Sequence, residues 1–352
     1  MEFIKTSKYL KGNFDRPISF AELKVLEKIK VNQKLELLPE KDNISLAKKY
    51  AKMGLKVIPI RRFSRRDWSK RTDFPNRILL EPTSKCNLRC RMCPRQNLKR
   101  PIMDFDKDLY FKVVDELDKY GVEGIWMFHL GEPILHPNWK EIVNYVCVKK
   151  NVEIFWFSTN GLSFNEDAID FVLNSKITFL NYSLHGTNEE TYNYVSPREH
   201  YKNIRSHLEL FLKKKKELGR GPIVHIQMID QEGTRSDINN FFETFYQSGE
   251  IVSINTLEYV NLPNNRYGLQ RKRPPIVKKC TRISRGDCFI VSNGDIQPCD
   301  ATYNSEILLG NVKEKAVYEI WNSEIRKSIL ELNNNGQMYK IEHCKKCTDY
   351  DL

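Results

Sequence analysis

Residues 77–93, RILLEPTSKCNLRCRMC, join a short apolar run to three closely spaced cysteines. RILLEP is the first of six strand-like runs, which are short and rich in apolar, β-branched and aromatic residues. The other five are GIWMFHL (124–130), NVEIFWFS (151–158), ITFLNYSL (177–184), PIVHIQMI (222–229) and IVSINTLEY (251–259). Helical patterns lie between successive runs, at residues 106–121, 138–150, 165–175, 201–219 and 237–249. From residue 77 onward the sequence therefore predicts an alternation of strand and helix.

Strands that alternate with helices of this length form parallel sheets with right-handed crossovers. Six such units fall short of the eight of a closed TIM barrel. We therefore expect an α/β fold in which residues 76–258 form a partial (β/α)6 TIM-type barrel. Ligands of parallel α/β sheets sit at the carboxyl ends of the strands, so the functional groups are expected in the loops that follow each run.

Three flanking segments differ from this alternation. Residues 1–75 predict an N-terminal helical extension, with helix-like apolar spacing at 19–31 and 43–54. Residues 259–279 are polar and proline-rich, which is typical of a linker. Residues 280–352 hold five of the nine cysteines and predict a small C-terminal domain, in which Asn293-Gly294 is typical of a hairpin turn.

The 352-residue chain carries a formal net charge of +12. A basic balance suits nucleic acid, anionic lipid or a phosphorylated substrate. The two basic clusters, residues 61–71 and 213–216, are more simply explained as solvated faces, and the sequence contains no nucleic-acid-binding module. No apolar run approaches 18 residues, and the first residues lack the apolar region of a secretory signal. We therefore expect a cytoplasmic protein that binds neither membrane nor nucleic acid.

Clustered cysteines in a cytosolic protein indicate metal or redox chemistry rather than disulfides. Cys86, Cys90 and Cys93 are spaced so that three thiolates can wrap one metal centre. Zinc in structural sites usually takes four protein ligands, and no fourth Cys or His is adjacent. A three-cysteine loop instead suits a [4Fe–4S] cluster with one open iron. Structural zinc is the alternative interpretation.

The CxxxCxxC spacing directly after a first strand resembles the signature of the radical S-adenosylmethionine (SAM) superfamily. The resemblance implies that Cys86, Cys90 and Cys93 bind three irons, and that SAM chelates the fourth through its amino and carboxylate groups. Reductive cleavage of SAM then yields a 5′-deoxyadenosyl radical, which abstracts a hydrogen atom from the substrate. The cofactor supplies this chemistry, while the protein positions it and excludes water.

Two later strand ends carry motifs similar to those of this superfamily. HLGEP follows the second strand, and its Gly131 and Glu132 resemble the family's GE motif. The resemblance implies that Glu132 accepts a hydrogen bond from the SAM ammonium. STNG follows the third strand and resembles the family's usual ending there, which makes Ser158, Thr159 and Asn160 candidate SAM contacts.

Three further positions are expected near SAM from the same resemblance. Ser183 follows the fourth strand, at a position that often contacts the SAM ribose or carboxylate. Met92 matches the hydrophobic position before the third cysteine. The family often has an arginine in the next helix for the SAM carboxylate. A simple alignment puts Ser196 there, so Arg198, two residues on, is the candidate instead.

The late cysteines form a second pattern, which consists of Cys280, Cys299, Cys344 and Cys347. Together with the LGN and EIWNS segments that follow the hairpin, they resemble the SPASM/twitch extensions of radical SAM enzymes. The resemblance implies one auxiliary [4Fe–4S] cluster with these four cysteines as ligands; a four-cysteine zinc site is the alternative. Four protein ligands leave no open iron, so we expect the auxiliary cluster to transfer electrons rather than to coordinate substrate.

Two cysteines fall outside both patterns. Cys288 is open to three interpretations: a packed strand residue, a cluster ligand in place of Cys280, or a catalytic hydrogen-atom donor of the kind that radical epimerases use. Cys147 lies within a helix pattern and is expected in the core.

The resemblance implies a radical SAM oxidoreductase or epimerase that acts on a carbohydrate, an aminocyclitol or a peptide. Its expected partners are that substrate and a reductant such as flavodoxin or ferredoxin. Asp300 and Tyr303, beside and near Cys299, are candidate substrate-facing groups. A two-cluster electron-transfer or structural metal-binding protein is the alternative outside enzymology, and it does not require a GE motif.

Overall fold

The computed structural model describes residues 34–35, 56–57, 68, 71–198, 200–245, 251–256, 279–345 and 347. The helices predicted at 19–31 and 43–54, and nearly all of the predicted linker 259–279, lie outside these residues. Two short strands near the N-terminus, β1 (Lys34–Leu35) and β2 (Lys56–Val57), pair in parallel. In the part of the chain that the structure describes, no helix is both long and apolar enough to cross a membrane.

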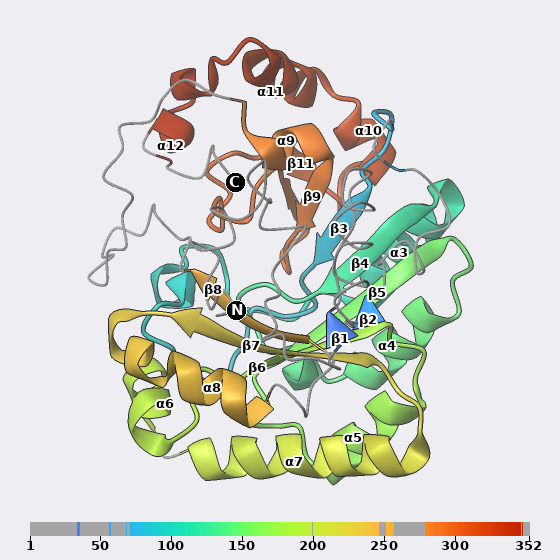
Figure 1. The fold of residues 1–352 in the computed structure, drawn as a ribbon. Helices are drawn as coiled ribbons and strands as arrows, with labels where there is room; N and C mark the ends of the chain where they lie inside the picture. The colour runs from blue at the N-terminus through green and yellow to red at the C-terminus, as the bar shows by residue number, and fades with distance from the viewer. Residues whose placement is uncertain are drawn as a thin grey trace.

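One sheet organises the molecule (Figure 1). Six of its strands are parallel and adjacent in chain order: β3 (Arg77–Leu80), β4 (Val122–Met127), β5 (Val152–Thr159), β6 (Phe179–Ser183), β7 (Ile223–Asp230) and β8 (Ile251–Thr256). The order across the sheet, β11-β10-β9-β3-β4-β5-β6-β7-β8, does not close on itself. The predicted partial (β/α)6 barrel is thereby confirmed.

The C-terminal strands continue this sheet. Strand β9 (Asp287–Ile290) pairs in parallel with β3, and β10 (Asp295–Gln297) and β11 (Gly310–Asn311) follow as antiparallel neighbours. Gly294 turns the chain between β9 and β10 with a φ of 93°, as the Asn-Gly pair predicted. The cysteine-rich C-terminal residues therefore share a sheet with the barrel.

Six helices follow the barrel strands: α3 (Lys107–Tyr120), α4 (Trp139–Cys147), α5 (Glu166–Asn174), α6 (Glu189–Val195), α7 (Tyr201–Leu218) and α8 (Ile238–Phe245). Side chains of Asp106, Asn165 and Asn188 cap α3, α5 and α6 by accepting main-chain N–H groups. The helical pattern at 237–249 is in part the 3-10 helix η5 (Glu232–Asp237) followed by α8. The sequence analysis missed α6, because a helix of seven residues is too short to show a clear helical repeat of apolar residues.

Shorter elements complete the described chain. They are η3 (Pro94–Asn97), η4 (Pro133–Leu135), α9 (Thr281–Arg285), α10 (Val317–Trp321), α11 (Glu324–Asn334), η6 (Met338–Lys340) and α12 (Glu342–Lys345). The last four lie with α9 around β9 to β11, in the red region of Figure 1.

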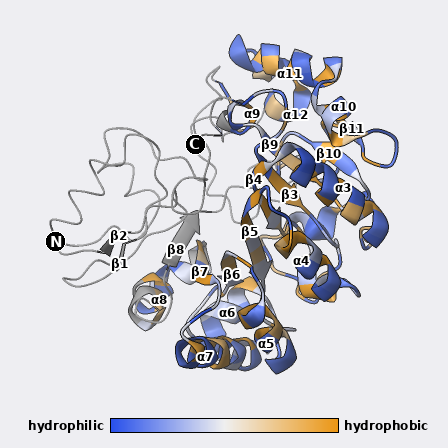
Figure 2. Cartoon of the chain, turned by 90° about the vertical axis from the view of Figure 1, so that its right-hand side faces the viewer, coloured by the Kyte–Doolittle hydropathy of each residue, from blue (hydrophilic) through white to orange (hydrophobic). Residues whose placement is uncertain are grey.

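The two faces of the sheet have different chemistry. Residues in register on the helix-covered face, among them Ile78, Ile125, Phe155 and Cys288, belong to the main apolar core and are at most 4% exposed. Figure 2 shows hydrophobic residues gathered along the strands and on the helix faces that cover them. The opposite face is polar near the carboxyl ends of the strands, where the functional groups were predicted.

Candidate active site

The first cysteine loop leaves the end of β3 and is fixed by main-chain hydrogen bonds. Arg91 N–H donates to the carbonyl of Val195 at the end of α6, over 2.8 Å. Cys93 N–H donates to the Cys90 carbonyl over 3.0 Å, and Gln96 Nε2 donates to the same carbonyl over 3.2 Å. The loop thus forms a tight turn that is attached to the barrel at both ends, with all three cysteines half-buried.

The surroundings of the three thiols raise their pKa values and so disfavour the thiolate form. Burial, the largest cause in each case, raises the pKa of Cys86 to about 11 and the pKa values of Cys90 and Cys93 above their usual range. The thiols are also near enough to raise the pKa of one another, since Cys93 acts on both Cys86 and Cys90. Asn160 Nδ2 donates to Cys86 Sγ over 3.6 Å. A polycationic iron centre is the kind of ligand that stabilises such thiolates.

The first cysteine loop offers three thiols to a metal centre. Among the described residues, no three His, Cys, Asp or Glu side chains form a group that could hold one ion. A tetrahedral zinc with bonds of about 2.3 Å brings its sulfurs within about 4 Å of one another, whereas a cubane cluster spaces its ligands more widely. Three thiols from one loop are the donor set of a [4Fe–4S] cluster that keeps one iron open, and Cys86, Cys90 and Cys93 supply them.

Glu132 joins two of the motifs that are predicted to bind SAM. Its carboxylate accepts hydrogen bonds from Thr159 Oγ1 over 2.8 Å and from Asn160 N–H over 2.7 Å, so the GE and STNG motifs meet as predicted. The side chain is 2% exposed, and burial raises its pKa to about 7 against these hydrogen bonds, which lower it. Among the described residues, Glu132 has no ion-pair partner, so its buried carboxylate can accept an N–H from the SAM amino group.

Gly131 has a steric role in this arrangement. A Cβ at this position would lie 1.9 Å from the carbonyl oxygen of Thr83, in the loop that leads to the cysteines. The residue must therefore be glycine for the strand end and the cysteine loop to approach this closely. Main-chain N–H of Glu132 donates to the Lys85 carbonyl over 2.8 Å and ties the two segments together.

The polar face continues across β5 and β6. Asn181 Nδ2 donates to Ser158 Oγ over 2.8 Å and lies 3.4 Å from Ser183 Oγ. Asn181 is 6% exposed, and its Oδ1 has no hydrogen-bond partner within the described chain. An unpaired buried carbonyl is costly, which points to a ligand donor at this spot. Ser158 and Ser183 thus both contact Asn181, which the sequence analysis missed, and the roles of the two serines toward SAM stay predictions.

The remaining predicted SAM contacts lie near the cysteine loop. Met92 is buried and packs with Val195. Ser196, also buried, is hydrogen-bonded to the Cys90 thiol, an interaction that lowers the pKa of that thiol. Arg198 is exposed, and its main-chain N–H donates to the Ser196 carbonyl over 2.8 Å. The role of Arg198 toward the SAM carboxylate stays a prediction.

The late cysteines lie on the C-terminal elements. Cys280 precedes α9, and its N–H donates to Asn333 Oδ1 over 2.6 Å, while Asn333 Nδ2 donates back to the Cys280 carbonyl over 3.2 Å. Cys344 lies in α12, and Cys347 N–H donates to its carbonyl over 3.0 Å. Cys280, Cys344 and Cys347 are all partly buried against the main core.

Cys299 follows β10 and receives an N–H···S hydrogen bond from Ala301 over 3.4 Å. Burial holds the pKa of its thiol well above the usual range, with smaller contributions from Asp300 and from nearby Cys280. Arg282 Nε contacts the Asp300 carboxylate at 3.0 Å. Cys280 and Cys299 are thus close together, as the predicted auxiliary site requires, and the assignment of all four cysteines as ligands remains a prediction.

Replacing Asn333 with alanine is expected to weaken the auxiliary site. Asn333 is fully buried, and its loss leaves the Cys280 N–H without a partner, at a cost of about 1–3 kcal/mol. The midpoint temperature of thermal unfolding and the iron content per chain should both be lower in Asn333→Ala. The exposed neighbour Asn334 provides the control, and equal values for Asn333→Ala and Asn334→Ala would refute this role.

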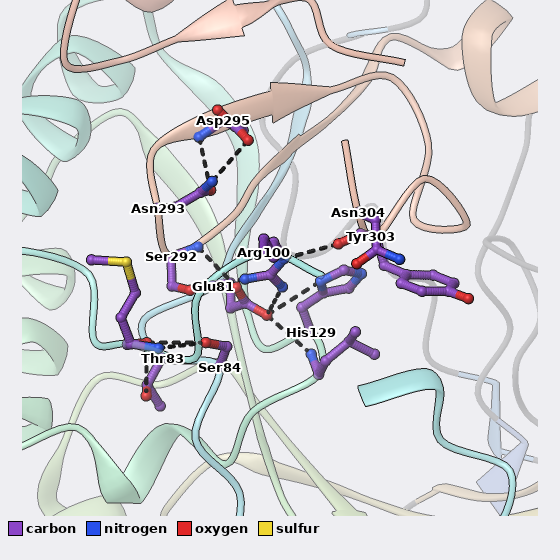
Figure 3. Close-up of polar contacts among 12 residues, drawn as sticks. Glu81, Thr83, Ser84, Arg100, His129, Ser292, Asn293, Asp295, Tyr303 and Asn304 are labelled. Atoms are coloured by element: carbon purple, nitrogen blue, oxygen red, sulfur yellow. Dashed lines mark hydrogen bonds and ion pairs between the residues drawn. The ribbon is translucent and has the colours of Figure 1, made fainter. Parts of the chain in front are cut away.

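A network centred on Glu81 was not foreseen (Figure 3). Glu81 directly follows β3 and is fully buried, and it pairs with Arg100 over 2.8 Å. Burial alone would raise the pKa of Glu81, but contacts with His129 and Arg100 outweigh it and lower the pKa to about 2. One feature of the sequence could have indicated Glu81: it is a carboxylate directly after an apolar strand, and parallel sheets bind ligands at that end of their strands.

Cys288 and Cys147 are both away from the polar face. Cys288 is fully buried in β9 in register with Ile78, on the helix-covered face. Burial raises the pKa of its thiol above the usual range. This position favours the packed interpretation over the ligand and hydrogen-donor interpretations. Cys147 ends α4 and packs against the core, as expected.

Comparison with known families agrees with this geometry. The radical SAM superfamily model matches residues 80–234, and the SPASM model, described as an iron–sulfur cluster-binding domain, matches residues 280–348. The chain is a member of the radical SAM superfamily. Within it, the chain belongs with the enzymes that carry a SPASM domain, and its cofactors are SAM, the [4Fe–4S] cluster that binds it and one auxiliary [4Fe–4S] cluster.

Individual relatives are distant but cover most of the chain. The tungsten-containing aldehyde ferredoxin oxidoreductase cofactor-modifying protein of Pyrococcus furiosus is 27% identical over 70% of this chain and 81% of its own length. The SAM-dependent 2-deoxy-scyllo-inosamine dehydrogenase of Niallia circulans is 21% identical over 78% and 93%. The structure of anSMEcpe with bound AdoMet and the Cp18Cys peptide is 15% identical over 79% and 92%, with a TM-score of 0.56.

Proposed function

We propose that this radical SAM enzyme carries out a two-electron oxidation of a polar substrate, a carbohydrate or aminocyclitol or a peptide side chain. The observation that carries the proposal is the single sheet edge at which the cysteine loop, Glu132 and the polar residues of β5 and β6 converge, next to the cysteine-rich segment. When bound, SAM and the clusters supply a hydrogen-abstracting radical and an acceptor for the second electron.

The residues of the chain have separable tasks in this proposal. Cys86, Cys90 and Cys93 hold the first cluster, and Glu132 accepts a hydrogen bond from the SAM amino group, with Thr159 and Asn160 fixing the Glu132 carboxylate. Cys280, Cys299, Cys344 and Cys347 hold the auxiliary cluster. The buried polar groups exclude bulk water from the space between them.

The position of Cys288 supports oxidation over epimerisation. An epimerase of the expected type needs a thiol that faces the substrate radical. All nine cysteines lie in the described chain. Seven are assigned to clusters, and the other two, Cys147 and Cys288, pack in the core. Without a facing thiol, loss of an electron and a proton is the simpler fate of the radical.

The polar face and the named relatives together suggest a polar substrate. Asn181 Oδ1 is a buried acceptor with no partner among the described residues, and Ser158 and Ser183 lie beside it. A hydroxyl, amine or amide N–H would satisfy it. One relative is named as a dehydrogenase of 2-deoxy-scyllo-inosamine and one similar structure holds a peptide, so both substrate classes stay within the proposal.

Anaerobic reconstitution tests the proposal. The protein is loaded with iron and sulfide, reduced with dithionite or with flavodoxin or ferredoxin, and supplied with SAM. Formation of 5′-deoxyadenosine is expected, and aminocyclitols and cysteine- or serine-containing peptides are then screened for a product lighter by two hydrogens. If no 5′-deoxyadenosine forms under any of these conditions, the chain is better described as a two-cluster electron-transfer protein.

Replacing Cys288 with alanine is expected to leave the turnover of 5′-deoxyadenosine and of the oxidised product within about twofold of the unmodified enzyme. The reason is that the thiol lies on the far face of the sheet. Cys288→Ala should lose some packing in the core, which is measured as a modestly lower melting temperature. Solvent deuterium appearing at an unoxidised product carbon, and disappearing in Cys288→Ala, would instead establish epimerisation.

A further inference from the structure

The Glu81 network, defined as Glu81, Arg100, His129 and Ser292, lies where the barrel meets the auxiliary segment, residues 287–304. Both oxygens of the Glu81 carboxylate are used. Oε1 accepts from Arg100 Nη2 over 2.8 Å and from Leu130 N–H over 3.3 Å, and Oε2 accepts from Ser292 N–H over 2.8 Å. His129 Nδ1 lies 3.3 Å from Oε1.

Arg100 extends the network into the auxiliary segment. Its three guanidinium nitrogens have separate partners: Nη2 on Glu81, Nη1 on Ser292 Oγ at 3.0 Å and Nε on the Tyr303 carbonyl at 2.9 Å. The Arg100 side chain is 3% exposed and that of Glu81 is fully buried. Figure 3 shows the planar group of Arg100 between Glu81 and the chain at Tyr303.

His129 makes the second connection. Its Nε2 lies 3.3 Å from the main-chain oxygen of Asp300, directly beside Cys299. The network therefore holds the auxiliary segment on both sides of Cys299, at Ser292 before it and at Asp300 and Tyr303 after it. On the barrel side, it holds the chain beyond Cys93 through Arg100 and the chain before Glu132 through His129.

We infer that Glu81 is a positioning residue that, beyond the pairing of β9 with β3, fixes the auxiliary-cluster segment around Cys299 against the SAM-cluster loop. The inference rests on the proposed ligands of the two clusters. Its physical basis is that a fully engaged Arg–carboxylate pair has one geometry, whereas the β9–β10 hairpin and the β10–β11 pairing are each only two residue pairs long. Without the pair, the auxiliary segment should open locally while the barrel persists.

Hydrogen–deuterium exchange of the cluster-free full chain tests this inference without any substrate. Glu81→Gln keeps the shape of the side chain and removes its charge. Amide exchange in residues 287–304 is expected to be at least about tenfold faster in Glu81→Gln, with β4 to β7 unchanged. Glu123→Gln is the matched control, because Glu123 pairs with Arg77 across β3 and β4 at the other end of β3.

Reconstituted protein gives the second readout. Glu81→Gln should lose the auxiliary cluster selectively, so that iron falls toward half while SAM-dependent 5′-deoxyadenosine formation persists. Unchanged exchange in residues 287–304 would overturn the inference, as would equal loss of protection in barrel and segment. If Glu81→Gln fails to fold, the same exchange measurement is made on Arg100→Lys. Lysine keeps the positive charge but can reach only one of the three partners of Arg100, which are Glu81, Ser292 and the Tyr303 carbonyl. Absence of 5′-deoxyadenosine from the unmodified enzyme would count against the proposed function alone.

Discussion

Replacing Cys90 with alanine is expected to abolish SAM cleavage while the fold is kept. Cys90 stands in the middle of the CxxxCxxC loop, and the proposed cluster has no other described thiol within the loop to replace it. Reconstituted Cys90→Ala should bind about half the iron of the unmodified enzyme, because the auxiliary cluster is independent of this loop. Iron and sulfide analysis, together with chromatographic assay of 5′-deoxyadenosine, measures both effects.

Cys147→Ala is the matched control for this experiment. Cys147 is a partly buried cysteine in α4, it is assigned to neither cluster, and its substitution should leave iron content and SAM cleavage unchanged. If Cys90→Ala retained full iron and SAM cleavage, the assignment of the first cluster would be wrong. If it lost all of its iron, the two sites would not be independent.

Replacing Glu132 with glutamine is expected to weaken SAM binding by about ten- to hundredfold at pH 8, because a charge-assisted hydrogen bond from the SAM amino group to the carboxylate is lost. Binding to the unmodified enzyme should also depend on pH. Burial raises the pKa of Glu132 to about 7, so below pH 7 SAM must displace a proton and its affinity should fall by about tenfold per pH unit. Calorimetric titration of the reconstituted enzyme measures this slope, which should vanish in Glu132→Gln.

The Glu132 carboxylate should also make the stability of the SAM-free protein depend on pH, in the opposite direction to SAM affinity. The pKa of Glu132 is higher in the folded chain than the ordinary 4.5, so the unfolded chain releases its proton first as pH rises. The folded state therefore loses stability between about pH 4.5 and 7, and the loss is complete above pH 7. Without SAM, Glu132→Gln should melt higher than the unmodified chain at pH 8 and similarly at pH 4.5. Glu141→Gln, an exposed change in α4, should show neither effect.

Much of the barrel could be predicted because local pattern and tertiary structure agree there. The six strand-like runs are the six parallel strands, and motifs placed after runs meet at the sheet edge, as Glu132 and Asn160 do. Chain order was sufficient, since successive βα units are neighbours in such sheets.

Contacts between distant segments could not be predicted in this way. Glu81 and Ser292 are far apart in the chain, and neither belongs to a repeating motif. The pairing of β9 with β3 joins strands from opposite ends of the described fold, which no local periodicity encodes. Asn181 was missed for another reason: its role is visible only from the unpaired Oδ1 that burial leaves behind.

The pairing of β9 with β3 also limits how the protein can be divided. Cutting the chain at the predicted linker would strip β9 from β3 and expose a row of main-chain N–H and C=O groups along an apolar strand. Such an edge is a template for association with other chains. A barrel expressed alone should therefore aggregate rather than persist as a soluble fragment, even though its own core would be nearly intact.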